Sequence, residues 1–145
     1  MRRASLSHEF VEFIPPDPKE GTLYISIPYA TAVHLCACGC GIKVVTPISP
    51  PEWHLLYDGD TVSLMPSIGN WQFPCRSHYV IRRNAIKWAR TLNDQEIAEG
   101  RRRDAEDLER YFADRLTVDS DAPSTPLTQQ REPFLHRIRR LIRLR

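Results

Sequence analysis

Short segments in which every second residue is apolar recur through the first 90 or so residues, and polar, glycine and proline residues separate them. Alternation of this kind is typical of half-buried β-strands. The stretches "TLYISIPYA", "TAVHLCACG" and "IKVVTPI" are therefore predicted strands. "WHLLYDGDTVSLMP" predicts a hairpin that turns at Asp58-Gly59, and "RSHYVIRRNAIKWA" predicts a second hairpin that turns at Arg83-Asn84.

The pattern changes at residue 93, where the charged stretch "NDQEIAEGRRRDAEDLERYFADRL" begins. Its Asn/Asp start, early acidic residues and later arginines predict a helix over residues 93–117. The apolar stripe of this helix is narrow and consists of Ile97, Leu108, Tyr111, Phe112 and Leu116. Residues 118–133 are polar and contain prolines, which predicts a linker. Residues 134–145 place apolar and arginine side chains on different faces of a short basic amphipathic helix.

These patterns predict a mainly β fold, a small antiparallel sheet or open barrel over residues 1–92, followed by the charged helix and the basic tail. No apolar run approaches the roughly 20 residues of a membrane span. The start "MRRASLSHEFVEF" lacks the apolar stretch of a secretory signal. We therefore expect a cytoplasmic protein, whose cysteines stay reduced.

The positive charge of the chain lies in its last 15 residues. The net charge is +2, but the six arginines and one glutamate of residues 131–145 give +5, so the rest of the chain carries −3. A basic amphipathic segment can dock on the protein's own acidic helix, on an acidic partner, or on an anionic membrane or nucleic acid. We expect the tail to contact an acidic partner or an anionic surface.

Three of the four cysteines alternate along "AVHLCACGCGIKVV", and the fourth follows after 34 intervening residues in "FPCRSHYVI". They are Cys36, Cys38, Cys40 and Cys75. Reduced cysteines at close spacing are typical metal ligands, and four thiolates complete a structural zinc site. His78 or His34 can replace one thiol as a ligand. The alternatives are that these cysteines are small buried side chains, or that one is a catalytic thiol.

A serine and a histidine flank the cysteines at matching distances. If "HLCAC" and "CRSHY" are neighbouring antiparallel strands with Cys36 opposite Cys75, then Ser77 lies opposite His34 on the same face. That pairing predicts a nucleophile, Ser77, and a base, His34, beside the metal site. The alternative is that both residues only form hydrogen bonds around the thiolates.

A second serine, Ser67, lies in "PSIGNWQFP" and is the competing nucleophile. The Gly69-Asn70 loop that follows can present backbone N–H groups to an oxyanion. The alternative is an ordinary turn with Trp71 in the core. In "HEFVEFIP", Glu12 lies between two apolar residues and can point inward, which makes it a candidate acid to orient the imidazole. The alternative is that Glu12 faces solvent.

Five blocks resemble a bacterial family that includes the BubE-type peptidases of ubiquitin-like conjugation operons. The blocks, within residues 8–89, are "HEFVEFIP", "LYISIPYATAVHLCACGCG", "VVTPISP", "DGDTVSLMPSIGNW" and "CRSHYVI". The resemblance implies a zinc-stabilised β domain and a serine-dependent peptidase that trims a ubiquitin-like precursor or removes that protein from its targets. It also implies a ubiquitin-like protein and its conjugation enzymes as partners. The resemblance also implies, from the histidine at position 34, that this chain is one of the active members of the family.

Two other functions remain open. A non-catalytic zinc-ribbon-like module would use the same β surface to bind a partner protein. Metal-dependent hydrolysis is the weaker alternative, because four cysteine ligands leave no open coordination position.

Overall fold

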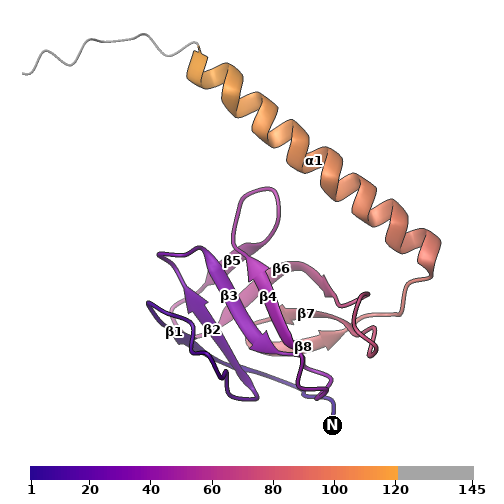
Figure 1. Ribbon diagram of the computed structural model, residues 1–145. Coiled ribbons are helices and arrows are strands. Elements are labelled where there is room, and N and C mark those ends of the chain that lie inside the picture. Colours follow the sequence, from indigo (N-terminus) through magenta and orange to yellow (C-terminus); the bar gives the residue numbers. More distant parts are fainter. Residues whose placement is uncertain (121–145) are drawn as a thin grey trace, which may run out of the picture.

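The computed structural model describes residues 1–120, which form eight strands in two four-stranded sheets and one C-terminal helix (Figure 1). The expected mainly β fold is confirmed, although the strands divide between two sheets and do not close into a barrel. Residues 121–133 of the expected linker, and the basic tail at 134–145, lie outside the described residues. Among residues 1–120, no helix combines the length and the apolar character that a membrane span requires.

The first sheet contains the first four strands in the order of the sequence. They are β1 (Ser7–Phe10), β2 (Thr22–Ser26), β3 (Thr31–Leu35) and β4 (Lys43–Pro47). β2, β3 and β4 pair antiparallel, as expected, but β1 runs parallel to β2. The expectation of a purely antiparallel sheet was therefore wrong at this edge. A parallel pair needs a connection that returns to the same end of the sheet, and residues 11–21 provide it.

The second sheet contains the other four strands, all antiparallel and again in sequence order. They are β5 (His54–Tyr57), β6 (Val62–Gly69), β7 (His78–Arg82) and β8 (Ala85–Trp88). Both predicted hairpins are confirmed, as β5–β6 and β7–β8. The register of β6 against β7 shifts between Leu64 and Ile68, which marks a β-bulge.

One cluster of buried side chains fills the space that the two sheets share. Leu23 and Ile25 of β2 belong to it together with Leu64 of β6 and Ile81 of β7, and all four side chains are fully buried. Side chains from both sheets therefore pack into one common core.

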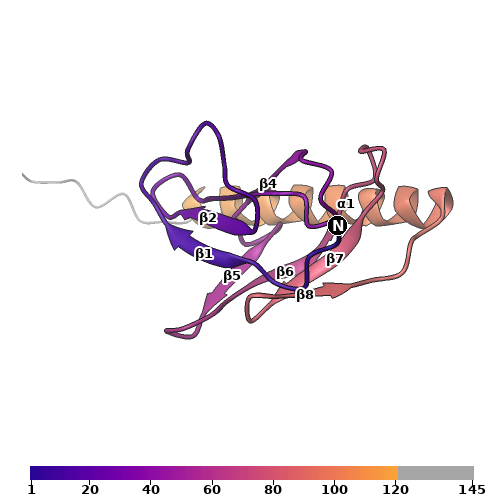
Figure 2. The same cartoon turned by 90° about the horizontal axis from the view of Figure 1, so that it is seen from below.

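The N-terminal segment joins the two sheets. Ile86 N donates to Ala4 O and Leu6 N donates to Asn84 O, each at 2.8 Å, before β1 pairs with β2. Figure 2 shows the segment running from the N-terminus past β8 to β1. One continuous stretch of chain thus bonds first to the edge of the second sheet and then to the edge of the first.

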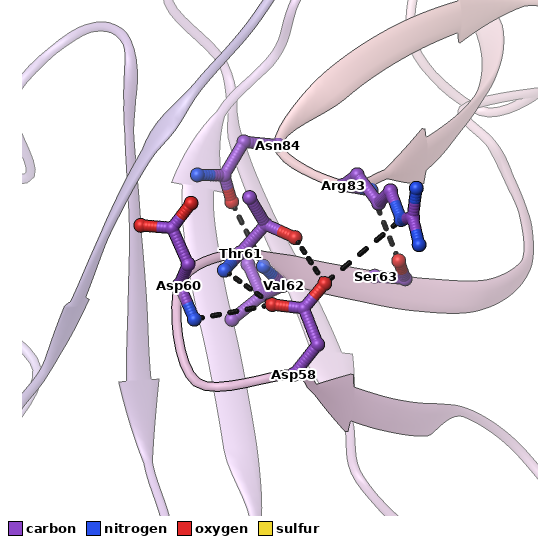
Figure 3. Close-up of polar contacts among 7 residues, drawn as sticks. All are labelled: Asp58, Asp60, Thr61, Val62, Ser63, Arg83 and Asn84. Carbon is purple, nitrogen blue, oxygen red and sulfur yellow. Dashed lines mark hydrogen bonds and ion pairs between the residues drawn. The ribbon is translucent and has the colours of Figure 1, made fainter.

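The turns of the two hairpins lie beside each other and share polar contacts (Figure 3). In the β5–β6 turn, Asp58 Oδ1 accepts hydrogen bonds from Asp60 N at 3.1 Å and Thr61 N at 2.7 Å. Asp58 Oδ2 accepts a third bond from Thr61 Oγ1 at 2.7 Å. The sequence forms this turn because an aspartate side chain can replace the backbone acceptor of a tight turn.

The β7–β8 turn binds to the start of β6. Asn84 N donates to Val62 O at 2.9 Å, and Val62 N donates to Asn84 Oδ1 at 3.0 Å. Arg83 and Asn84 have φ values of 48° and 61°, as a two-residue hairpin turn with two left-handed residues requires. Asparagine tolerates this conformation better than most residues do.

The helix α1 (Asp94–Ser120) follows β8 and includes residues 118–120, which we had assigned to the linker. Asn93 caps it: Asn93 Oδ1 accepts from Glu96 N, and Asn93 N donates to Glu96 Oε2, both at 2.9 Å. Ion pairs Arg76–Asp94 and Arg90–Glu96 hold its first turn, each at 2.6 Å. Between residues 94 and 116, Ile97 is the only buried side chain. The body therefore contacts α1 mainly at its N-terminal end.

Candidate functional site

The four cysteines form one cluster, in which every sulfur lies within 4.8 Å of the others. Three of them come from the turn between β3 and β4, and Cys75 comes from the loop between β6 and β7. The Sγ–Sγ distances are 3.4 Å for Cys36–Cys38, 3.8 Å for Cys40–Cys75 and 3.9 Å for Cys36–Cys75. Four thiolates around zinc lie about 3.8 Å apart, because each Zn–S bond is about 2.3 Å long. The cluster therefore fits a tetrahedral metal ion, and its all-sulfur donor set favours zinc.

Glycines allow the chain to wrap three cysteines around one point. Gly39 and Gly41 have φ values of 85° and 76°, in the left-handed region that side chains disfavour. Gly39 N donates to Cys36 O at 2.9 Å, and Cys36 N donates to Ile42 O at 2.8 Å. A Cβ at Gly39 would also lie 2.7 Å from Met1 N, so no side chain fits there.

The thiols of the cluster differ in pKa because their surroundings differ. Burial opposes ionisation of Cys75, but hydrogen bonds with Ser77 outweigh it and lower the pKa of this thiol to about 7. Burial, followed by hydrogen bonds with neighbouring thiols, raises the pKa of Cys38 to about 12. A bound cation would overcome the effect of burial on these pKa values, because a metal deprotonates the thiols that coordinate it.

Ser77 lies against the sulfur atoms and not against a histidine. Its Oγ is 3.0 Å from Cys36 Sγ, and it accepts a hydrogen bond from Asn70 Nδ2 at 2.9 Å. The asparagine nitrogen can only donate, so the single hydroxyl proton of Ser77 is free to point at Cys36 Sγ or at Cys75 Sγ, which lies 3.6 Å away. Asn70 Nδ2 is itself 3.5 Å from the same sulfur. Ser77 is 6% exposed and acts here as a hydrogen-bonding partner of the thiols.

His34 lies in the core between the sheets and is fully buried. Its Nε2 is 2.8 Å from the hydroxyl of Tyr79, and its Nδ1 has no hydrogen-bonding partner within residues 1–120. Burial lowers the pKa of His34 to about 4, so the ring is neutral at pH 7. No hydrogen bond joins it to Ser77 in the described part of the chain.

The strand pairing that placed Ser77 opposite His34 was wrong. β3 pairs with β2 and β4, whereas β7 pairs with β6 and β8. Cys36 and Cys75 come together across the core shared by the two sheets, and not along one ladder. Opposite residues of an antiparallel pair follow a fixed register, but Cys36 and Cys75 are not such a pair. Their proximity therefore does not place Ser77 opposite His34.

Two further candidates were open to alternatives. Glu12, which could point inward or face solvent, is exposed, because β1 ends at Phe10 and its alternation does not continue. The backbone carbonyl of Glu12 accepts a hydrogen bond from Ser26 Oγ at 2.6 Å. The Gly69-Asn70 pair is not a loop with free N–H groups, since Gly69 ends β6 and Asn70 N donates to Ser77 O at 2.9 Å.

A groove of about 780 Å³ lies between the second sheet and α1. Ser67, Trp71 and His78 line it on the sheet side, and Ile97 and Leu108 line it on the helix side. Ser67, Trp71 and His78 are half-buried, so Trp71 is a wall of this groove and not a plug in the core. The indole of Trp71 lies over Gly69, where a Cβ would come within 2.3 Å of Trp71 Nε1.

His78 belongs to this groove and not to the cysteine cluster. Its Nδ1 is 2.7 Å from Arg90 O, and its ring centroid is 4.9 Å from that of Trp71. Its place near Cys75 in the sequence had indicated only a substitute metal ligand. The alternation of "CRSHY" contained the relevant signal, because Cys75 and Ser77 face one way and His78 faces the other.

Residues 10–89 match the family model described as bacterial ubiquitination-like system serine protease (BubE). The chain belongs to this family. The resemblance noted in the sequence is thereby confirmed, and the matched segment includes β2–β8, the four cysteines and both candidate serines. α1 lies outside the segment that matches the BubE family. No curated protein and no solved structure matches the chain.

Proposed function

We propose that this protein is a serine peptidase that cleaves the peptide or isopeptide bond following the tail of a ubiquitin-like protein. The family match carries this proposal, because it describes a serine protease of a ubiquitination-like system and spans both candidate nucleophiles. Such a system offers two substrates of this kind: a precursor with residues beyond the tail, and a conjugate on a target protein. The groove beside Ser67 provides an open surface on which an extended tail can bind.

The cysteine cluster supports a structural role for the metal in this proposal. Cys36, Cys38, Cys40 and Cys75 would hold zinc and tie the turn after β3 to the loop before β7. When bound, zinc would cross-link these two segments. It would have no open coordination position for catalysis, since four thiolates complete its tetrahedron. The same coordination leaves no thiol free to attack a carbonyl, so a serine remains as the nucleophile.

A fluorophosphonate probe, which reacts with activated serines, tests the proposal. The zinc-loaded protein should be labelled at one serine and should cleave a ubiquitin-like precursor that carries residues beyond its tail. Heat-unfolded protein is the control and should not be labelled, because an unactivated serine is a weak nucleophile. Folded, zinc-loaded protein that is neither labelled nor able to cleave the precursor would refute the peptidase.

A binding module is the second candidate, and the position of Ser77 favours it. The hydroxyl of this serine is engaged by Asn70 and Cys36, as in a purely structural site. A module of this kind would bind a ubiquitin-like protein in calorimetry without cleaving it and without reacting with the probe.

A further inference from the structure

Building on the proposed peptidase activity, we propose that Ser67 is its nucleophile and His78 its general base, in the groove outside the cysteine cluster. Three observations lead to this pair: the register of β6 and β7, the hydrogen bond of the His78 ring, and the contrast with the buried pair Ser77 and His34.

The register places Ser67 and His78 on one face of the second sheet. Gly69 pairs with His78, and Ile68 pairs with Tyr79. Side chains two residues apart share a face, so Ser67 lies on the same face as Gly69 and is the diagonal neighbour of His78. Diagonal neighbours have Cβ atoms up to about 7–8 Å apart, within reach of an imidazole ring.

Burial agrees with this assignment of faces. Ile68 and Tyr79 point into the core and are 2% and 0% exposed. Ser67 and His78 are half-buried and line the groove. Ser67 lies within the register shift between Leu64 and Ile68, and irregularities of this kind are frequent next to active sites.

The hydrogen bond from His78 determines which ring nitrogen is the base. A carbonyl oxygen can only accept, so the 2.7 Å contact with Arg90 O requires the proton on Nδ1. The neutral ring then carries its lone pair on Nε2, where a general base needs it. The ring of Trp71 contacts the imidazole at a centroid distance of 4.9 Å and an interplanar angle of 59°. The Arg90 carbonyl thus orients the imidazole, as a carboxylate does in a serine–histidine–aspartate triad.

The buried pair lacks these properties. The Ser77 hydroxyl is bound by Asn70 and Cys36, and His34 Nε2 is bound by Tyr79. A substrate carbonyl cannot approach side chains that are 6% and 0% exposed. The hydroxyl of Ser67, in contrast, forms no hydrogen bond to any residue between 1 and 120.

The reaction follows the usual acyl-transfer sequence with these two residues. Ser67 Oγ attacks the carbonyl carbon while its proton passes to His78 Nε2. The C–N bond then breaks, and the leaving nitrogen takes its electron pair and the proton from Nε2. A water molecule attacks the Ser67 ester and gives a proton to Nε2. When the ester C–O bond breaks, Ser67 recovers a proton and the tail leaves with a free carboxyl group.

Ser67→Ala and His78→Asn test the pair, with Ser7→Ala and His54→Gln as exposed controls on other strands. Ser67→Ala should lose all probe labelling and precursor cleavage. His78→Asn keeps an amide donor for Arg90 O but removes Nε2, so both rates should fall about 10²- to 10⁴-fold. Zinc content and melting temperature should stay near those of the unsubstituted protein, and both controls should keep full activity.

Two further measurements separate catalysis from packing. Added imidazole should restore part of the activity of His78→Ala, which a loss of packing alone would not allow. Peptide mapping of the labelled, unsubstituted protein should place the adduct on Ser67. An adduct on Ser77 would overturn this assignment and leave the peptidase proposal intact. Complete absence of labelling and cleavage in the unsubstituted protein would refute the peptidase itself.

Discussion

The cysteine cluster and the groove are neighbours, since Asn70 lines the groove and bonds to Ser77 beside the cluster, but their polar groups differ in burial and bonding. Around the cluster, Ser77, Asn70 and Tyr79 are buried and bound to one another or to their neighbours. In the groove, Ser67 and His78 are half-buried, and one nitrogen of the histidine is free of bonds to residues 1–120. An unpaired buried polar group costs about 1–3 kcal/mol, so a structural centre tends to satisfy its members. His34 Nδ1, which has no partner within residues 1–120, is an exception next to Tyr79. A site that acts on a substrate must instead leave donors and acceptors open.

The largest effect is expected when one cysteine ligand is removed from the cluster. Cys38→Ala should leave the β domain unable to bind one zinc per chain and unable to fold stably. Structural zinc sites contribute about 10–16 kcal/mol of apparent binding energy that is also folding energy. Circular dichroism would follow unfolding, and elemental analysis would follow the metal. A metal-free protein that keeps its melting temperature would show that the cluster does not stabilise the fold.

A smaller effect is expected from the hydroxyl next to the cluster. Ser77→Ala should weaken zinc binding about 10- to 100-fold, as loss of a hydrogen bond to a metal ligand typically does. Competition against a chelator of known affinity would measure this. Ser67→Ala is the matched control in the groove and should bind zinc like the unsubstituted protein. Equal zinc affinities of Ser77→Ala and Ser67→Ala would show that Ser77 supports the metal site no more than the groove residue Ser67 does.

The hairpin turns lie outside the cysteine cluster and the groove, so a substitution there is a reference for effects on folding stability alone. Asn84→Ala should lower the free energy of unfolding by about 1–3 kcal/mol, because Val62 N loses its acceptor. Alanine also disfavours the φ of 61° at this position. Asn84→Gly keeps the backbone conformation and should lose less. Urea denaturation would rank the variants, and identical losses would show that backbone conformation is unimportant there.

The smallest expected effect is the pH dependence of Asp58. Hydrogen bonds from Thr61, first its backbone and then its side chain, lower the pKa of this carboxyl to about 2. The unfolded-state pKa is higher, near 3.8, so the folded protein gains stability above that pH and loses it as the pH falls towards 2. Denaturation of Asp58→Asn beside the unsubstituted protein should show their difference in stability shrinking over this range. A constant difference would mean that the carboxylate charge does not contribute.

Local patterns explain which elements the sequence could predict. The Asp58-Gly59 and Arg83-Asn84 turns encode their hairpins because neighbouring residues determine the turn geometry. The division into two sheets and the parallel pairing of β1 depend on contacts between distant segments, which no local pattern contains. The cysteine cluster followed from residue type and spacing alone.

The pairing of Ser77 with His34 could not be derived from the same spacing. Two segments that share a metal can face each other across a core or lie along one sheet, and only the second case fixes a register. His78 was within reach of sequence reasoning, since its position is out of phase with Cys75 and Ser77. Its proximity to Ser67 still required the register of β6 and β7.

The segment that joins the two sheets has a consequence for folding during synthesis. Residues 3–6 are synthesised before their partners, which are Ala37, Asn84 and Ile86. The ribosome must therefore release nearly the whole β domain before this segment can bind, and contacts over such sequence distances slow folding. Until β8 is available, the β7 edge of the second sheet remains open to pairing with other chains. Nascent chains of this protein should accordingly depend on protection from chaperones until residue 86 has left the ribosome.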